Sequence, residues 1–145
     1  MITPTTIKTT INRLLKSSFP NIPVISQNVE EGFQQPSFTV RIEDYAAESL
    51  QESLEQSMTV RVFYFPDFSD TEYHIDVLDK QFKIPRTFGN KLYVEDRALN
   101  VTEPSITIVD GILDFSFDLL FEQYDEANDP ENGKPTGEEL TLNIE

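Results

Sequence analysis

The sequence has no cysteine, one histidine and only five glycines. Without thiols, the chain cannot form a disulfide, a zinc finger, an iron–sulfur cluster or a cysteine nucleophile. The single histidine, His74, falls in a predicted helix beside acidic residues, which is more typical of a surface side chain than of a ligand or a catalytic base. The glycines are too scattered to form a phosphate-binding loop. We therefore expect no catalytic residues, no cofactor and no metal site.

Long apolar runs are also missing, and so is an N-terminal signal pattern, so we expect a soluble, unprocessed protein without a membrane segment. Cations are scarce: 11 lysines and arginines stand against 26 acids, for a net charge of −15. Such a charge disfavours wrapping around DNA or lying on an anionic membrane.

The few cations are unevenly placed. Lys8, Arg13 and Lys16 lie in residues 1–29, which hold no acid and so carry +3, leaving −18 for the remaining residues. A positive end and a negative body favour head-to-tail association between copies, with these three side chains at the contact between subunits. The alternative is a solvated helix face that happens to carry three basic residues.

The chain length of 145 residues and its 38% hydrophobic content predict one domain with one sizeable core. We place this domain at residues 1–124. Residues 125–145 form an acidic segment with too little apolar content to order itself alone, and we expect a flexible tail. Leu140, Leu142 and Ile144 alternate at its end, so they could add a strand to a sheet edge, either of the same subunit or of a neighbouring copy.

Two amphipathic helices are predicted. The first begins with Thr3 as N-cap and Pro4 at the first helical position, and it ends near Ser18. Its buried face is expected to hold Ile7, Ile11, Leu14 and Leu15. The second is expected to begin with a capping box from Ser69 to Glu72 and to end at Pro85. Its buried face is expected to hold Ile75, Leu78 and Phe82.

Alternating apolar residues predict several strands. One follows Pro36 and carries Phe38, Val40 and Ile42 on one side, and another runs from Ser57 to Phe65. A short or edge strand is expected at Ile22 to Val29. Two short β segments, Lys91 to Glu95 and the residues through Val101, follow a turn at Gly89-Asn90. The polar residues 45–56 either extend two strands into an overhanging arm or form a loop, and periodicity does not choose between them.

The strongest local pattern is a hairpin at Asp110-Gly111. Asp-Gly is favoured in two-residue turns because both central residues need positive φ. The outgoing strand, from Ile112 to Gln123, places five large apolar side chains on one face: Leu113, Phe115, Phe117, Leu119 and Phe121. The fold class is therefore α+β, with a mixed, mainly antiparallel sheet of about five to six strands. Two helices pack on one face of it, in the order α-β-β-β-α-β-β-β.

Carboxylates are abundant, but none forms a specific catalytic or metal-binding pattern. Asp114 and Asp118 fall on the solvent side of the predicted outgoing strand, where acids keep a sheet soluble. Residues 125–131 lack the glycine and glutamate spacing of an EF-hand loop. An enzyme that uses carboxylates and a metal is therefore the least favoured alternative.

Several short motifs resemble one family when they are taken in order. They are the helix pattern Ile7-Lys8-x-x-Ile11-x-x-x-Leu15, then Phe19-Pro20-Asn21-Ile22-Pro23-Val24-Ile25, Glu31-Gly32-Phe33, Pro36-Ser37-Phe38, Tyr64-Phe65-Pro66 and Val109-Asp110-Gly111-Ile112-Leu113-Asp114-Phe115. This arrangement resembles the tail terminator family of long-tailed phages and of defective prophages in Gram-positive bacteria. The resemblance covers residues 1 to about 124.

The resemblance implies a non-enzymatic virion subunit that forms a hexameric ring on the end of the tail tube. There it would end tube polymerisation and present the surface that joins the tail to the DNA-filled head. The implied partners are the tail tube protein and a head completion or connector protein. DNA passes through without specific binding, and assembly takes place in the host cytoplasm. The alternatives are an acidic binding module such as a DNA-mimic inhibitor, or a different connector or completion protein.

Overall fold

The structure is a computed structural model that describes residues 1–25 and 35–128. The elements in chain order are α1 (Pro4–Ser18), β1 (Ser37–Ser49), β2 (Ser53–Phe65), α2 (Tyr73–Phe88), β3 (Lys91–Val94), β4 (Arg97–Asn100), β5 (Thr102–Val109), β6 (Ile112–Tyr124) and a 3₁₀ turn (Glu126–Asn128). The α+β class is confirmed. The six strands divide into an antiparallel four-stranded sheet, in the order β1-β2-β6-β5, and a two-stranded sheet, β3-β4.

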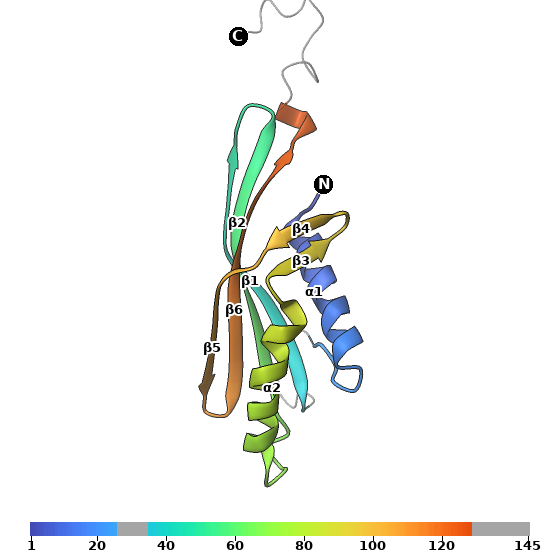
Figure 1. Ribbon diagram of the computed structural model, residues 1–145, viewed down its shortest axis with the longest axis vertical. Coiled ribbons are helices and arrows are strands. Elements are labelled where there is room, and N and C mark those ends of the chain that lie inside the picture. Colours follow the sequence, from blue (N-terminus) through green and yellow to red (C-terminus); the bar gives the residue numbers. More distant parts are fainter. Residues whose placement is uncertain (26–34, 129–145) are drawn as a thin grey trace, which may run out of the picture.

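Both helices lie against the same side of the four-stranded sheet (Figure 1). Along β2 and β6, successive residues alternate between buried and partly exposed, as expected for a sheet covered on one face. We call the covered side the inner face and the other side the outer face. The inner-face residues of these strands join the core: Met58, Val60, Val62, Tyr64, Leu113, Phe115, Phe117, Leu119 and Phe121.

Helix α1 agrees closely with its prediction. It starts at Pro4, and the Thr3 side chain accepts a hydrogen bond from the Thr6 backbone N–H. Ile7, Ile11 and Leu15 are fully buried, and Leu14 packs partly buried against the same core. The spacing of these residues therefore identified the buried face of α1 correctly.

Residues 45–56 form the arm rather than a loop. β1 and β2 remain paired from Ser37 opposite Phe65 out to Ser49 opposite Leu54, and β6 follows β2 to its end. The three strands extend well past the helices (Figure 1). A register shift after Glu43, where Asp44 has a φ of 54°, marks the base of this arm.

The predicted start of α2 is wrong. The helix begins at Tyr73, and Glu72 at its N-cap makes no side-chain capping bond. The Ser69 hydroxyl and backbone N–H both bond to Oδ1 of Asp67, at 2.6 and 3.0 Å, so Ser69 belongs to a local turn before the helix. The end of the helix was also predicted too early. Pro85 lies within the last turn, and the chain stays helical as far as the buried Phe88.

The predicted buried face of α2 is wrong as well. Val77, Ile84 and Phe88 are the apolar residues that this helix buries, and Lys80 lies among them. Ile75, Leu78 and Phe82 instead have 54%, 58% and 65% of their surface exposed. The helix carries two apolar stripes on roughly opposite sides, and periodicity alone cannot tell which one meets the sheet.

The strand expected at Ile22 to Val29 does not form in its described part. Val24 makes only an isolated parallel bridge with Phe38, through the Pro23 carbonyl and the Ile25 N–H. Pro23 has no N–H to continue a ladder. Residues 26–29 lie outside the described part of the chain, as do Leu140, Leu142 and Ile144.

The hairpin between β5 and β6 is confirmed. Val109 pairs with Ile112, and Asp110 and Gly111 have φ values of 54° and 81°. Positive φ at both positions is the requirement that predicted this turn. A side chain at position 111 would also meet an aromatic ring, because its Cβ would lie 2.8 Å from Cε1 of Phe68.

Candidate assembly surfaces

The described residues offer little that resembles a reaction centre. Within residues 1–25 and 35–128, no three histidine, aspartate or glutamate side chains gather in a way that could hold a metal ion. No helix in the same part of the chain is long and apolar enough to cross a membrane. His74 is exposed, and its ring lies edge-on to the Tyr73 ring. Surfaces suited to binding are therefore the features to compare.

The first surface is the exposed apolar stripe of α2, formed by Ile75, Leu78 and Phe82, which we call the outer stripe. Its residues follow i, i+3, i+7 spacing, so they line one side of the helix. The guanidinium of Arg86 lies 5.1 Å from the centre of the Phe82 ring. In the described part of the chain Arg86 makes no ion pair, so it adds an unneutralised positive charge to the stripe.

The second surface is the basic side of α1, where Lys8, Arg13 and Lys16 were expected to contact a neighbour. All three are exposed and none forms an ion pair with a described residue. Helical geometry, at about 100° per residue, brings Arg13 and Lys16 together on the side away from the core and places Lys8 toward its edge. The structure therefore groups two of the three and leaves Lys8 apart.

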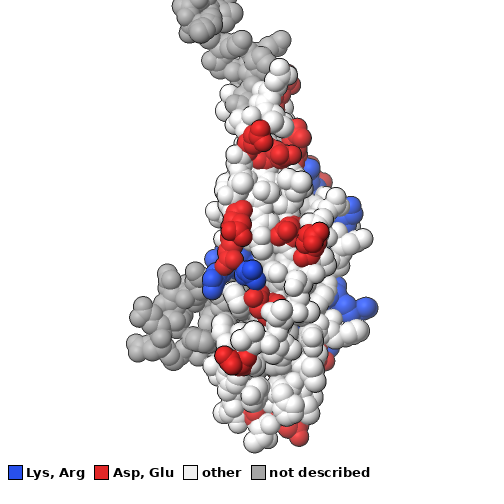
Figure 2. Space-filling model, turned by 90° about the vertical axis from the view of Figure 1, so that its left-hand side faces the viewer, with Lys and Arg blue, Asp and Glu red and all other residues white. Residues whose placement is uncertain are grey.

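The third surface is the outer face of the sheet, which Figure 2 shows with acidic patches along its length and a basic group between them. Arg41 and Arg61 lie directly opposite each other on β1 and β2. Glu43 accepts hydrogen bonds from both, and Asp114 accepts another from Arg61. Both arginines are therefore paired with nearby acids. The hydrogen bond to Glu43 raises the pKa of Arg61, although burial opposes the shift.

Farther along the outer face, toward the arm, is a hollow of about 310 Å³, which we call the outer-face hollow. Leu120 lies in it and is 59% exposed, although its neighbours on β6 alternate between core and acidic residues. Asp118 accepts a hydrogen bond from Thr59 at 2.8 Å. Neither Asp118 nor Asp44, which also lines the hollow, makes an ion pair among the described residues.

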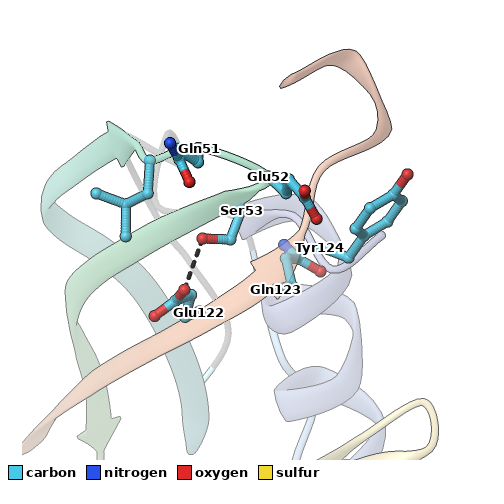
Figure 3. Close-up of a pocket in the computed structure, with 7 residues that line it drawn as sticks. Gln51, Glu52, Ser53, Glu122, Gln123 and Tyr124 are labelled. Atoms are coloured by element: carbon cyan, nitrogen blue, oxygen red, sulfur yellow. Dashed lines mark hydrogen bonds between the residues drawn. The ribbon is translucent and has the colours of Figure 1, made fainter. Parts of the chain in front are cut away.

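The tip of the arm carries a fourth, shallow groove. Figure 3 shows residues 51–53 on one side of it and residues 122–124 on the other. The Ser53 hydroxyl donates a hydrogen bond of 2.6 Å to the Glu122 carboxylate across the groove. The lining mixes acids, amides and Tyr124, so this groove suits a polar protein contact rather than a small apolar ligand.

A polar cluster beneath α2 fixes the orientation of that helix. The buried Tyr64 hydroxyl on β2 donates a hydrogen bond to Asp76, and Lys80 bonds to the same carboxylate at 2.7 Å. Burial, and then the bond to Asp76, raise the pKa of Tyr64 above its usual value, so its hydroxyl stays protonated well into the alkaline range. Lys80 thus occupies the buried side with its charge satisfied, and the outer stripe is turned away from the sheet.

A second polar cluster ties the N-terminal residues to the arm. The side chains of Gln56 and Gln123 both donate to the carbonyl of Ile2, and Gln123 also accepts from the Ile2 N–H. Gln56 is almost fully buried on the inner face. These glutamines were not singled out from the sequence. The sequence indicates them only by an amide side chain at positions where the alternation of β2 and β6 predicts an apolar residue.

The outer stripe and the hollow were missed for different reasons. Ile75, Leu78 and Phe82 were assigned to the core, and Leu120 was passed over as one apolar residue among acids. Leu120 does break the alternation of β6, which is a detectable signal. The sequence does not show that Asp44 lies near Leu120, because the two residues come together only when β1 pairs with β2 in the sheet.

Comparison with known proteins identifies a family. A family model described as phage tail terminator protein matches residues 6–131, which is most of the chain. No curated protein matches the sequence. One solved structure, which carries no functional name, is 14% identical and covers 86% of this chain and 97% of its own, with a TM-score of 0.43. On the extent of the family match, the chain belongs to the phage tail terminator family, a family of structural proteins of the phage tail.

Proposed function

We propose that this protein caps the tail tube, ends its polymerisation and forms the surface to which the head attaches. The observation that carries the proposal is the family match over residues 6–131. The shape supports it, since the arm extends past the helices and gives the subunit a second contact region away from its body (Figure 1). One region can hold the tube while the other remains free for a head completion or connector protein.

The subunits form a ring in this proposal, with six as the expected number. A ring needs two different surfaces on each subunit that meet their counterparts on the neighbours. The helix layer carries cations without ion pairs, and the outer face carries acids without ion pairs, among the described residues. These opposite charges support head-to-tail contact between copies.

DNA passes through the ring without being bound in this proposal. A net charge of −15 supports this, because acidic walls repel phosphates and leave a duplex free to slide. The protein works by binding alone, with no catalytic step and no cofactor. We place the folded domain at residues 1–124, an acidic tail at 125–145, and assembly in the bacterial cytoplasm before the protein becomes part of the virion.

Deleting the gene is expected to give tail tubes of uncontrolled, mostly excessive length, and tails that do not join heads, because nothing then ends tube growth. The measurement is the length distribution of tails by electron microscopy, with the intact gene supplied from a plasmid as the control. Tubes of normal length without the protein would count against termination, and normal joining to heads would count against the second half of the proposal.

Reversing the charges of Lys8, Arg13 and Lys16 to glutamate is expected to prevent ring formation, because the positive side of α1 then repels the acidic surface of the next subunit. Light scattering of the assembled protein gives the mass. The control is Lys91→Glu on β3, which reverses one positive charge outside α1 and should leave the mass unchanged. An unchanged mass in the triple variant would remove α1 from the contact.

A further inference from the structure

The outer stripe of α2 is the most exposed apolar surface on the helix layer. Ile75, Leu78 and Phe82 each leave more than half of their surface in water. The opposite side of α2 is already buried on the sheet by Val77, Ile84 and Phe88. Helices with apolar residues on two opposite sides are usually covered on both sides. In the single subunit the outer stripe is not covered, so we expect another molecule to cover it.

The outer-face hollow has the complementary chemistry. Leu120 supplies an exposed apolar floor, and Asp44 and Asp118 add negative charge beside it. The outer stripe offers an apolar ring with a positive guanidinium stacked on it, in Phe82 and Arg86. An apolar contact surrounded by opposite charges combines burial of apolar area with a preferred orientation.

These two surfaces cannot meet within one molecule. The outer stripe faces away from the inner face of the sheet, since the other side of α2 packs on that face. Leu120 lies on the outer face, because its neighbours Leu119 and Phe121 point into the core. Contact between the two surfaces therefore requires two molecules, and it leaves one stripe and one hollow free at the ends of the pair.

We propose that the outer stripe of one subunit docks into the outer-face hollow of a second copy of the chain. Phe82 and Leu78 cover Leu120, and Arg86 lies against Asp118 and Asp44. The proposal rests on the ring-forming function given above, and it adds these α2 and sheet residues to the α1 cations already placed at the contact. Because the same two surfaces are used at every step, the contact repeats from subunit to subunit until the ring closes.

A second copy accounts for these surfaces better than the tube protein does. A contact to the tube needs one surface on this chain, whereas a repeating contact between copies needs two that match each other. The stripe and the hollow match in apolar character and are opposite in charge, and they lie on opposite layers of the same subunit. This pairing is what a heterologous contact requires.

The test uses introduced cysteines, since the natural chain has none. Asp79→Cys places a thiol beside the outer stripe, and Ser57→Cys places one in the hollow next to Leu120, with little change of shape. Tails that contain the double variant are purified and treated with a short bismaleimide, which joins two thiols. Denaturing gels are expected to show a ladder that continues beyond the dimer, because each subunit links to a neighbour at both surfaces.

Three control experiments test whether the ladder arises from the proposed contact. Each single-cysteine variant should stay monomeric, since a stripe does not meet a stripe and a hollow does not meet a hollow. The pair Ser57→Cys and Tyr93→Cys should give no ladder, because Tyr93 is 70% exposed on β3 and lies outside the proposed contact. Adding Leu78→Ser and Phe82→Ser to the double variant should lower the linked fraction by roughly tenfold or more, because the apolar anchors are lost.

Tail length and the presence of the protein are measured on the same preparations, which separates this proposal from the function on which it rests. Tails of normal length that contain the double variant without any ladder would overturn the stripe-to-hollow contact and leave termination intact. Dimers from a single-cysteine variant would overturn it in favour of a symmetric contact. A ladder of equal strength from the Tyr93 pair would show that linking does not depend on this contact, which also overturns it.

Discussion

Replacing Phe117 by alanine is expected to lower the free energy of unfolding by about 3–5 kcal/mol. Phe117 is fully buried at the centre of β6, and its ring lies 5.3 Å from the Phe88 ring and 5.6 Å from the Phe115 ring. The substitution removes the ring and leaves a cavity between α2 and the sheet. Since domains of this kind unfold with roughly 5–15 kcal/mol, the loss is a large part of the total.

Urea unfolding followed by circular dichroism measures this loss. With a slope of about 1–3 kcal/mol per molar urea, the midpoint should fall by roughly 2 M. Leu120→Ala is the matched control, because Leu120 lies three residues further along the same strand and is 59% exposed. It should change the stability of the free subunit by only about 0.5 kcal/mol. Similar losses in both variants would contradict the assignment of inner and outer faces on β6.

Replacing Gly111 by alanine is expected to cost about 1–3 kcal/mol, for two reasons that can be separated. The φ of 81° is unfavourable for a residue with a Cβ, and that Cβ would approach the Phe68 ring to 2.8 Å and the Tyr73 ring to 3.1 Å. The hairpin must therefore shift, or the Phe68 ring must move away from the turn. Thermal or urea unfolding of the purified variant gives the size of the loss.

A double-mutant cycle with Phe68→Ala divides this cost. Without the Phe68 ring, the close approach is relieved and only the backbone term and the contact to Tyr73 remain, so Gly111→Ala should cost less in that background. Gly111→Asn adds a second comparison, because asparagine tolerates positive φ while still carrying a Cβ. Equal penalties in both backgrounds would show that the Phe68 contact adds nothing, and no penalty at all would contradict the positive φ at the turn.

The fold was predictable from the sequence where a residue pattern is compatible with only one local structure. Helix α1 has a single apolar stripe between a proline start and an aromatic stop, and the alternation on β6 leaves no doubt about its inner face. The turn at Asp110-Gly111 followed from the φ requirement of a two-residue hairpin. The arm was predictable only as one of two outcomes, because polar strand residues and polar loop residues have similar composition.

Prediction failed on α2 because the helix has two apolar stripes. Ile75, Leu78 and Phe82 form a more continuous apolar set in the sequence than Val77, Ile84 and Phe88, which have Lys80 among them. The bond between Lys80 and Asp76, with Tyr64 beside it, satisfies the charge of Lys80 and so allows the latter side to be the buried one. An exposed apolar stripe has the same periodicity as one that packs on the core, so the sequence pattern could not identify the outer stripe as a surface. The outer-face hollow left only one sign in the sequence, the break that Leu120 makes in the alternation of β6.

The hydrogen bonds of Gln56 and Gln123 to the backbone of Ile2 also determine when the subunit can complete its folding during synthesis. Residues 2 and 123 are 121 positions apart, and β6 lies between β2 and β5 in the sheet. The ribosome must therefore release nearly all of β6 before the first residues can be held and the apolar side of α1 fully covered. Contacts over such separations form slowly. Until they form, the nascent chain exposes much of its future core, so subunits become competent for assembly only late, after translation of β6.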